Sequence, residues 1–340
     1  MKRIRFFGDF SDNFEEGLVK ITRKLRQSIS AEYDILDSGP YDIAAIHSSG
    51  FLEAMKYRRV HAKKIYWLHS DLQLRLRKEI IDSIQFYRHL ISPRKDVYAF
   101  PQRLLKSALR LLAAAIPLGF KRHYLAQMDL VIVPNQQMKD ALNLTNAIVI
   151  RHGIDTTKYT IHRKPEKTPH VGYFGHPTVN KGVLELATAF AGIDTAEKHM
   201  YFTNMNNKIR RFIAAKDNTI HVHGLIDDMP REYNRTDVVV LPFRHSGGAI
   251  ATPLVLLEAM ACGCAVITTD LPHLHEICGD SVIYVPPHDA QTLRHAISDL
   301  TENPKKRRRL GRKAHDRVAR LYDEKRMVRE YKAVLDRFTS

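Results

Sequence analysis

The sequence is poor in cysteine and has no long apolar run. Its 340 residues include only three cysteines, Cys262, Cys264 and Cys278, too few for a disulfide framework or a four-cysteine metal site. We expect Cys262 and Cys264 to fill the core and the surroundings to be reducing. No apolar stretch reaches the roughly 18 residues of a membrane-spanning helix. The N-terminus enters a strand directly, without a signal-peptide pattern. The sequence therefore predicts a cytoplasmic protein.

Acidic residues are also scarce. The chain holds 37 Asp and Glu against 53 Lys and Arg, a net charge of +16. Two blocks carry this excess: residues 72–122 hold 11 basic and three acidic residues, and residues 301–340 hold 14 and six. Basic blocks of this kind bind anionic membranes or nucleic acid. Because interleaved aromatic residues and a reader motif are lacking, we expect no nucleic-acid partner.

Short apolar runs alternate with helical patterns along most of the chain, which predicts an α/β protein with doubly wound parallel sheets. Besides a strand opening at His170, the expected strands are 3–7, 34–36, 43–46, 64–68, 129–134, 147–150, 200–203, 220–222, 238–241, 264–268 and 282–287. The length suits two domains, each with its own core. We place them at residues 1–157 and 158–322, with a hinge over 156–168. A final helix, 323–340, is expected to return to the first domain.

The most informative stretch is residues 238–268, which reads as strand, small-residue loop, short helix and strand. Thr252 is expected to cap the helix and Pro253 to be its first residue. Gly263 suits the left-handed position that ends it. The first turn then presents free N–H groups at Leu254 and Val255, with the helix dipole behind them. The sequence therefore predicts a phosphate-binding turn.

Glu258 is the one charged residue of this otherwise apolar helix. A helix that is apolar on every side is usually buried, and a buried carboxylate needs a partner. A sugar diol beside the bound phosphate is one such partner. The alternative is that Glu258 faces water on a half-exposed helix.

The run TPLVLLEAMACGCAVIT, residues 252–268, resembles the signature helix of retaining GT-B glycosyltransferases of family 4. The resemblance implies two Rossmann-like domains facing a cleft and a nucleotide-sugar donor. It also implies that Glu258 holds the donor ribose and that the turn at Leu254 and Val255 holds the pyrophosphate. The family usually has a second glutamate, in contact with the transferred sugar, where this chain has Ile250.

The loop that follows the strand at His170 resembles a second donor-binding element of the family. Family members carry a lysine just before a glycine there, which Lys181 and Gly182 match. The resemblance implies that Lys181 supports the leaving pyrophosphate. His176 stands near the position of a family arginine, so the pyrophosphate grip is expected to be weaker or pH-sensitive.

Three further positions are implied by the resemblance. Gly17 matches part of a glycine-rich turn near the donor phosphates, and Leu225 lies where the family stacks the nucleotide base. His69 follows a strand of the first domain, where family members carry a histidine that faces the donor sugar and the acceptor. The alternative for His69 is a structural or solvated histidine.

The resemblance implies a retaining hexosyltransferase, in which we expect Lys181, His176 and the amides of Leu254 and Val255 to stabilise the departing pyrophosphate. In the family view, the leaving phosphate itself takes the acceptor proton. No D-x-D motif stands in a suitable place, so we expect catalysis without a metal and no cofactor. The competing prediction is a binding or scaffold protein on a degenerate transferase fold, which Ile250 favours.

Residues 72–125 depart from the alternation of strands and helices and are expected to be a basic amphipathic insertion. Within 101–122, Leu104, Leu105 and Leu109 share an apolar helical face. The cations proposed to face an anionic membrane are Arg103, Lys106, Arg110, Lys121 and Arg122. This pattern predicts a peripheral membrane helix and a lipid-linked or cell-surface glycan as acceptor. The alternative is a helix that packs on its own sheet.

Overall fold

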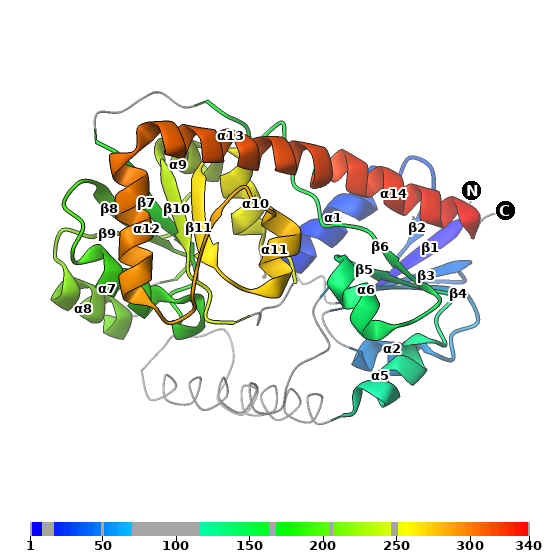
Figure 1. Cartoon of the computed structure of the whole chain (residues 1–340). Coiled ribbons are helices and arrows are strands. Elements are labelled where there is room, and N and C mark those ends of the chain that lie inside the picture. The colour runs from blue at the N-terminus through cyan, green and yellow to red at the C-terminus, as the bar shows by residue number, and fades with distance from the viewer. Residues whose placement is uncertain are drawn as a thin grey trace. The chain divides into compact units, whose positions relative to one another are not determined.

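The computed structural model describes residues 2–8, 17–48, 51–69, 116–162, 168–204, 207–245 and 251–338. Its chain divides into two compact units. Unit 1 comprises 1–150, 248–251 and 330–340, and unit 2 comprises 151–247 and 252–329. The division after Ile150 precedes the predicted boundary at 157. Each unit is an α/β layer structure in which helices flank one parallel sheet (Figure 1).

Unit 1 is built on a six-stranded sheet of order β2-β1-β3-β4-β5-β6, with every pair parallel. Its strands are β1 (Arg3–Phe7), β2 (Asp34–Leu36), β3 (Ile43–Ser48), β4 (Lys63–Leu68), β5 (Leu130–Val133) and β6 (Ala147–Val149). Its helices are α1 (Gly17–Ile29), α2 (Leu52–Tyr57), α5 (Leu118–Leu125) and α6 (Gln136–Leu142). The central strands β3 and β4 are nearly continuous apolar runs because helices cover both faces of a parallel sheet.

Unit 2 repeats this plan with the strand order β12-β11-β10-β7-β8-β9, again parallel throughout. Its strands are β7 (His170–Gly175), β8 (Glu197–Phe202), β9 (His221–His223), β10 (Val238–Leu241), β11 (Ala265–Thr269) and β12 (Ile283–Val285). Its helical elements are η1 (Val179–Lys181), α7 (Val183–Phe190), α8 (Asn207–Lys216), α9 (Met229–Arg235), α10 (Leu254–Ala261), α11 (Pro272–Cys278), α12 (Ala290–Glu302) and α13 (Pro304–Leu321).

The last helix, α14 (Glu324–Arg337), is shared between the units, because residues from 330 onward belong to unit 1. Tyr331 is fully buried in unit 1, where its ring stacks on Trp67 with centroids 5.3 Å apart. The predicted return of a C-terminal helix to the first unit thus applies to its second half. The three cysteines are buried and reduced, as core-filling residues are expected to be.

Candidate functional site

Unit 2 has its topological switch point between β7 and β10. The chain proceeds from β7 to β8 and β9 on one side, and then from β10 to β11 and β12 on the other. In open α/β sheets, ligands bind outside the carboxyl ends of the strands at such a point. The loops that leave these two strands carry Lys181 and the N-terminus of α10. The two predicted donor-binding elements therefore stand at one edge of one sheet.

Lys181 ends the 3-10 turn η1 after β7, and its ammonium lies 4.9 Å from the centre of the Phe243 ring. Burial lowers the pKa of Lys181. None of the ion pairs among the described residues includes this lysine. A half-buried ammonium without a carboxylate partner in the described chain favours an anion from outside the protein.

Gly182 fixes the position of this lysine. It adopts φ +72°, and a Cβ at this position would lie 1.8 Å from the carbonyl oxygen of Pro242, just after β10. Only glycine permits this conformation and this approach without strain. The N–H of Arg244 donates to the Asn180 carbonyl at 3.1 Å, and the Arg244 guanidinium pairs with Glu185 at 2.7 Å. The loops after β7 and β10 are therefore braced against each other.

Helix α10 begins one residue later than predicted. Pro253, in an extended conformation, is its N-cap residue, and Leu254 is its first helical residue. Thr252 therefore does not cap the helix. Its side chain is fully buried, and its hydroxyl has no hydrogen-bond partner in the described part of the chain. A buried hydroxyl of this kind costs free energy unless a ligand or water satisfies it. The first turn keeps Leu254 and Val255 in the predicted places, and Gly263 has the predicted left-handed φ of +68°.

Glu258 is 6% exposed, which excludes the alternative that it faces water. Its carboxylate accepts a hydrogen bond from the Tyr233 hydroxyl, with the oxygens 3.1 Å apart. Burial, followed by the Glu258 charge, raises the pKa of Tyr159 and of Tyr233, so both phenols remain protonated donors. The buried carboxylate thus has tyrosine partners inside unit 2, which the helix sequence did not indicate. The hydrogen bond from the Tyr233 hydroxyl fixes the orientation of the Glu258 carboxylate.

The other predicted donor positions are more exposed. His176 is an exposed residue in the loop after β7, and its Nδ1 lies 2.7 Å from the Thr203 hydroxyl. Partial desolvation of the ring and then the Lys181 charge lower the pKa of His176. Leu225 follows β9 and is 78% exposed. Gly17 is the first residue of α1 in unit 1. Ile250 lies outside the described residues.

His69 is placed differently from the prediction. It is fully buried in unit 1, and its Nε2 lies 3.2 Å from Nδ1 of His47, which is 1% exposed. The His69 ring stacks on Trp67 at 5.2 Å, and the Tyr331 hydroxyl lies 3.4 Å from Nε2 of His47. This placement supports the structural alternative for His69, because a fully buried imidazole presents no surface to a substrate.

The predicted membrane residues are only partly described. Arg103, Lys106 and Arg110 lie outside the described residues. Lys121 is 3% exposed and lies 5.6 Å from the centre of the Phe51 ring, so its prediction as a surface cation is wrong. Arg122 donates to the Ala141 carbonyl at 2.6 Å. Both side chains therefore interact with other residues of unit 1.

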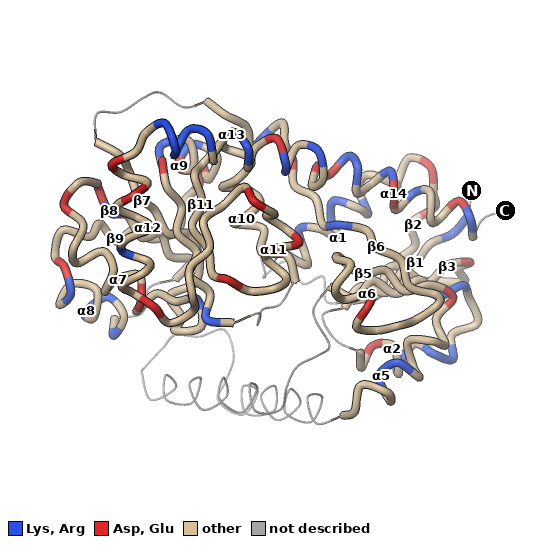
Figure 2. The backbone as a smooth tube through the Cα atoms, viewed as in Figure 1, with Lys and Arg blue, Asp and Glu red and all other residues tan. Residues whose placement is uncertain are grey.

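The second basic block forms helices α13 and α14, along which Lys and Arg recur (Figure 2). Part of its charge is paired inside unit 2: Lys306 binds Asp299 and Lys313 binds Asp280, each at 2.5 Å. Within the described ranges, no helix has the length and apolar character needed to cross a bilayer.

The sequence missed three contributors to the site: the Thr252 hydroxyl, the Tyr233 partner of Glu258 and the Arg244–Glu185 brace. Thr252 was interpreted as a cap, and a one-residue shift changes that role. Tyr233 and Glu185 lie far from their partners along the chain, and nothing in a single sequence pairs them. The approach of Gly182 to Pro242 was signalled only by the glycine itself.

Comparison with known proteins extends these observations. Residues 168–303 match the family model described as glycosyl transferases group 1. A glycogen synthase of Mycobacterium tuberculosis is 25% identical over 229 residues, which cover 58% of this chain and 51% of the relative. The chain thus spans about half the length of that relative.

Solved structures match over nearly the whole chain. The sucrose-phosphate synthase of Thermosynechococcus elongatus has a TM-score of 0.75 at 17% identity, covering 100% of this chain and 99% of its own. Anabaena HepE, solved in complex with UDP-glucose, has a TM-score of 0.70 at 15% identity, covering 99% and 100%. These likenesses confirm the predicted fold. The chain therefore has the two-sheet fold of GT-B glycosyltransferases, and its residues 168–303 are similar to the glycosyl transferases group 1.

Proposed function

We propose that this protein transfers a sugar from a nucleotide-sugar to a glycan or lipid-linked acceptor, with retention at the anomeric carbon. The carrying observation is Lys181, a half-buried ammonium without an ion-pair partner among the described residues, at the switch point of unit 2. The match of residues 168–303 to glycosyl transferases group 1 supports a transferase at this site.

The proposed role of this edge is to hold the donor pyrophosphate and to stabilise the charge that develops on it. Lys181 supplies a positive charge, the amides of Leu254 and Val255 supply N–H donors, and the Thr252 hydroxyl supplies another. Preorganised donors of this type stabilise a developing oxyanion because they need no reorganisation during the reaction. The bond from the sugar to the phosphate oxygen breaks, the acceptor oxygen bonds to the anomeric carbon, and the acceptor proton passes to the leaving phosphate.

Glu258 is proposed to accept hydrogen bonds from the donor ribose. Its burial supports this role, because a carboxylate shielded from water binds a diol without competition from solvent. Tyr233 would then position the carboxylate rather than touch the donor. Leu225, with its large exposed apolar side chain, is proposed to lie against the nucleotide base.

The first experiment is a screen of nucleotides and nucleotide-sugars for thermal stabilisation. The UDP-glucose bound by HepE makes UDP and UDP-sugars the first compounds to test. A ligand present at 100 times its dissociation constant adds about 2.7 kcal/mol of stability. We expect one nucleoside diphosphate and its sugar to stabilise the wild type. If no nucleotide raises the melting temperature at millimolar concentration, unit 2 does not bind a donor and the proposal is wrong.

Ile250, which replaces the usual second glutamate, favours a second candidate: a binding protein that recognises a nucleotide-sugar without turning it over. Release of nucleoside diphosphate in the presence of a glycan acceptor separates the two functions. Donor binding without any turnover across an acceptor panel would favour the binding protein. Turnover that persists in EDTA would support the proposed absence of a metal from the transfer step.

A lipid-linked acceptor at an anionic membrane is a further part of this proposal, and it rests on the remaining cations, Arg103, Lys106 and Arg110. Near an anionic leaflet each cation contributes about 1 kcal/mol, an attraction that salt weakens. We expect the wild type to co-sediment with phosphatidylserine vesicles at low salt, and Leu105→Asp with Leu109→Asp to abolish this while donor binding remains. A wild type that stays in the supernatant would point to a soluble acceptor.

A further inference from the structure

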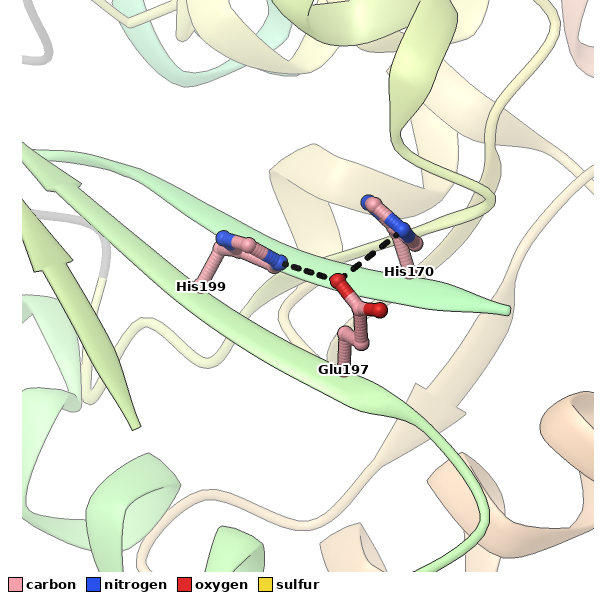
Figure 3. Close-up of side chains that lie close together, drawn as sticks. All are labelled: His170, Glu197 and His199. Carbon is pink, nitrogen blue, oxygen red and sulfur yellow. Dashed lines mark ion pairs between the residues drawn. The ribbon is translucent and has the colours of Figure 1, made fainter. Parts of the chain in front are cut away.

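Three possible metal ligands meet at the amino ends of two neighbouring strands of unit 2 (Figure 3). His170 opens β7, Glu197 opens β8, and His199 follows two residues later on β8. One carboxylate oxygen of Glu197 lies 3.1 Å from Nε2 of His170 and 3.4 Å from Nε2 of His199. All three ligand atoms lie within 4.8 Å of one another. Figure 3 shows the Glu197 carboxylate between the two rings.

The sheet register brings this group together. His170 is paired directly with Glu197, and Gly172 with His199. Alternate residues of a strand point to the same face, so all three side chains share one face of the sheet.

The two spacings between Glu197 and the histidine nitrogens suit a small tetrahedral cation. Metal–ligand bonds of about 2.0–2.1 Å put neighbouring ligand atoms about 3.3 Å apart in a tetrahedral zinc site. The two distances to Glu197, 3.1 Å and 3.4 Å, bracket that value. Two imidazoles and one carboxylate also form a donor set that zinc accepts, with water as the fourth ligand.

The surroundings of His199 favour metal binding through its Nε2. Its other ring nitrogen, Nδ1, lies 3.0 Å from Nε2 of His223, a contact that orients the ring as outer-shell partners of metal ligands do. The Nε2 atom itself is buried and faces the Glu197 carboxylate at 3.4 Å.

We propose that His170, Glu197 and His199 bind a divalent transition-metal ion of the zinc class. The Glu197 side chain is 47% exposed, so an ion can reach the group from solvent, while the two rings are largely enclosed. The site lies at the amino ends of β7 and β8, and Lys181 and α10 follow the carboxyl ends of β7 and β10. The ion thus stands apart from the proposed transfer chemistry and ties two strands together, and the inference does not depend on sugar transfer.

The test is zinc binding by tag-free protein after removal of bound metal, measured by competition with a chromophoric chelator. The chain has 18 histidines, so background binding must be separated from the site. We expect His199→Gln and Glu197→Gln each to weaken zinc binding at least tenfold. Glu197 is exposed, so its variant should fold even if a variant of the more enclosed His199 does not.

Two control variants sharpen the comparison. His221→Ala removes a ring that stacks on His199 at 5.0 Å but is not one of the three ligands, and we expect zinc affinity within twofold of the wild type. His275→Ala removes an exposed imidazole that pairs with Asp270 and stacks on Tyr284, and we expect zinc affinity to stay within twofold of the wild type here too. His223→Ala removes the partner of His199 Nδ1, and we expect weakening by about 10- to 100-fold.

Cobalt(II) provides a second readout that does not depend on affinity. Tetrahedral Co²⁺ absorbs visible light far more strongly than the hydrated ion, so the wild type should develop visible bands with one equivalent. His199→Gln should lose them. If Glu197→Gln and His199→Gln both keep wild-type zinc affinity and wild-type cobalt bands, the metal is held by other histidines and the proposal is overturned.

Discussion

Basic side chains near the carboxyl ends of the parallel strands have different surroundings in the two units. In unit 1, His47 and His69 turn inward, contact each other at 3.2 Å and are enclosed with Trp67 and Tyr331. In unit 2, Lys181 is half-buried without an ion-pair partner among the described residues, and the Thr252 hydroxyl is buried without a described hydrogen-bond partner. Two six-stranded parallel sheets thus carry an inward-facing histidine cluster in one unit and, in the other, polar groups without described partners. Unsatisfied polar groups are costly, so their presence favours a ligand on unit 2.

The largest effect that would test this contrast is expected from Lys181→Ala. Loss of a charge that stabilises the leaving pyrophosphate should lower kcat by about 100- to 1000-fold, the effect of removing one oxyanion donor. Stability should change little, because Lys181 makes no described ion pair. The matched control is Lys216→Ala, which removes an exposed lysine whose ammonium lies 5.5 Å from the centre of the Phe212 ring. If both variants turn over within a few-fold of the wild type, Lys181 is an ordinary surface cation.

Gly182→Ala tests whether the brace between the two loops positions the lysine. The added methyl group would clash with the Pro242 carbonyl oxygen. The alanine backbone would also have to adopt an unfavourable left-handed conformation. The expected destabilisation is about 3 kcal/mol, from overpacking and backbone strain together. Urea unfolding measures it. Gly39→Ala is the control, because Gly39 has φ +87° but nothing within 4 Å of the added methyl. Equal losses for the two variants would show that the contact with Pro242 has no energetic weight.

Glu258→Gln separates a ligand-binding carboxylate from a merely buried one. The amide can still accept from Tyr233, so the fold should persist, while binding of the nucleotide weakens by about 1.5–3 kcal/mol. Isothermal titration with the nucleotide found in the screen gives this difference. Tyr233→Phe should weaken binding less, because it removes the positioning hydroxyl only. Unchanged nucleotide affinity in a folded Glu258→Gln protein would place the ribose elsewhere.

The smallest effect on donor binding is expected from His69→Ala in unit 1. Removing a fully buried ring should lower the free energy of unfolding by about 1–3 kcal/mol, while donor affinity stays within twofold. Chemical unfolding and nucleotide titration of one preparation give both values. A variant with unchanged stability and a hundredfold loss of turnover would restore the catalytic role predicted for this histidine.

Much of the fold could be predicted from the sequence because its parallel strands are short apolar runs. The bounds expected for β1, β2 and β10 are those observed, and the final helix was predicted within one residue at its start. The resemblance of residues 252–268 to a known signature also located the helix that carries Glu258.

The site was harder to predict because it depends on the directions of side chains and on contacts between residues that lie far apart in the sequence. The sequence places His69 after a strand but does not say that its ring points toward His47. It shows Thr252 and Pro253 but not which of them has the conformation of a cap. The meeting of His170 with Glu197 and His199 depends on strand register, which no single segment contains.

The sharing of α14 between the units has a consequence for biosynthesis. A ribosome that has released residues up to 150 has made every strand of the first sheet, but not Tyr331, which packs beneath Trp67 and contacts His47. The interior of unit 1 is therefore completed by residues made after all of unit 2. A chain that ends near residue 329 should therefore contain a complete unit 2 but a unit 1 that lacks part of its core. We expect proteases to cleave such a chain in unit 1, the part that is synthesised first.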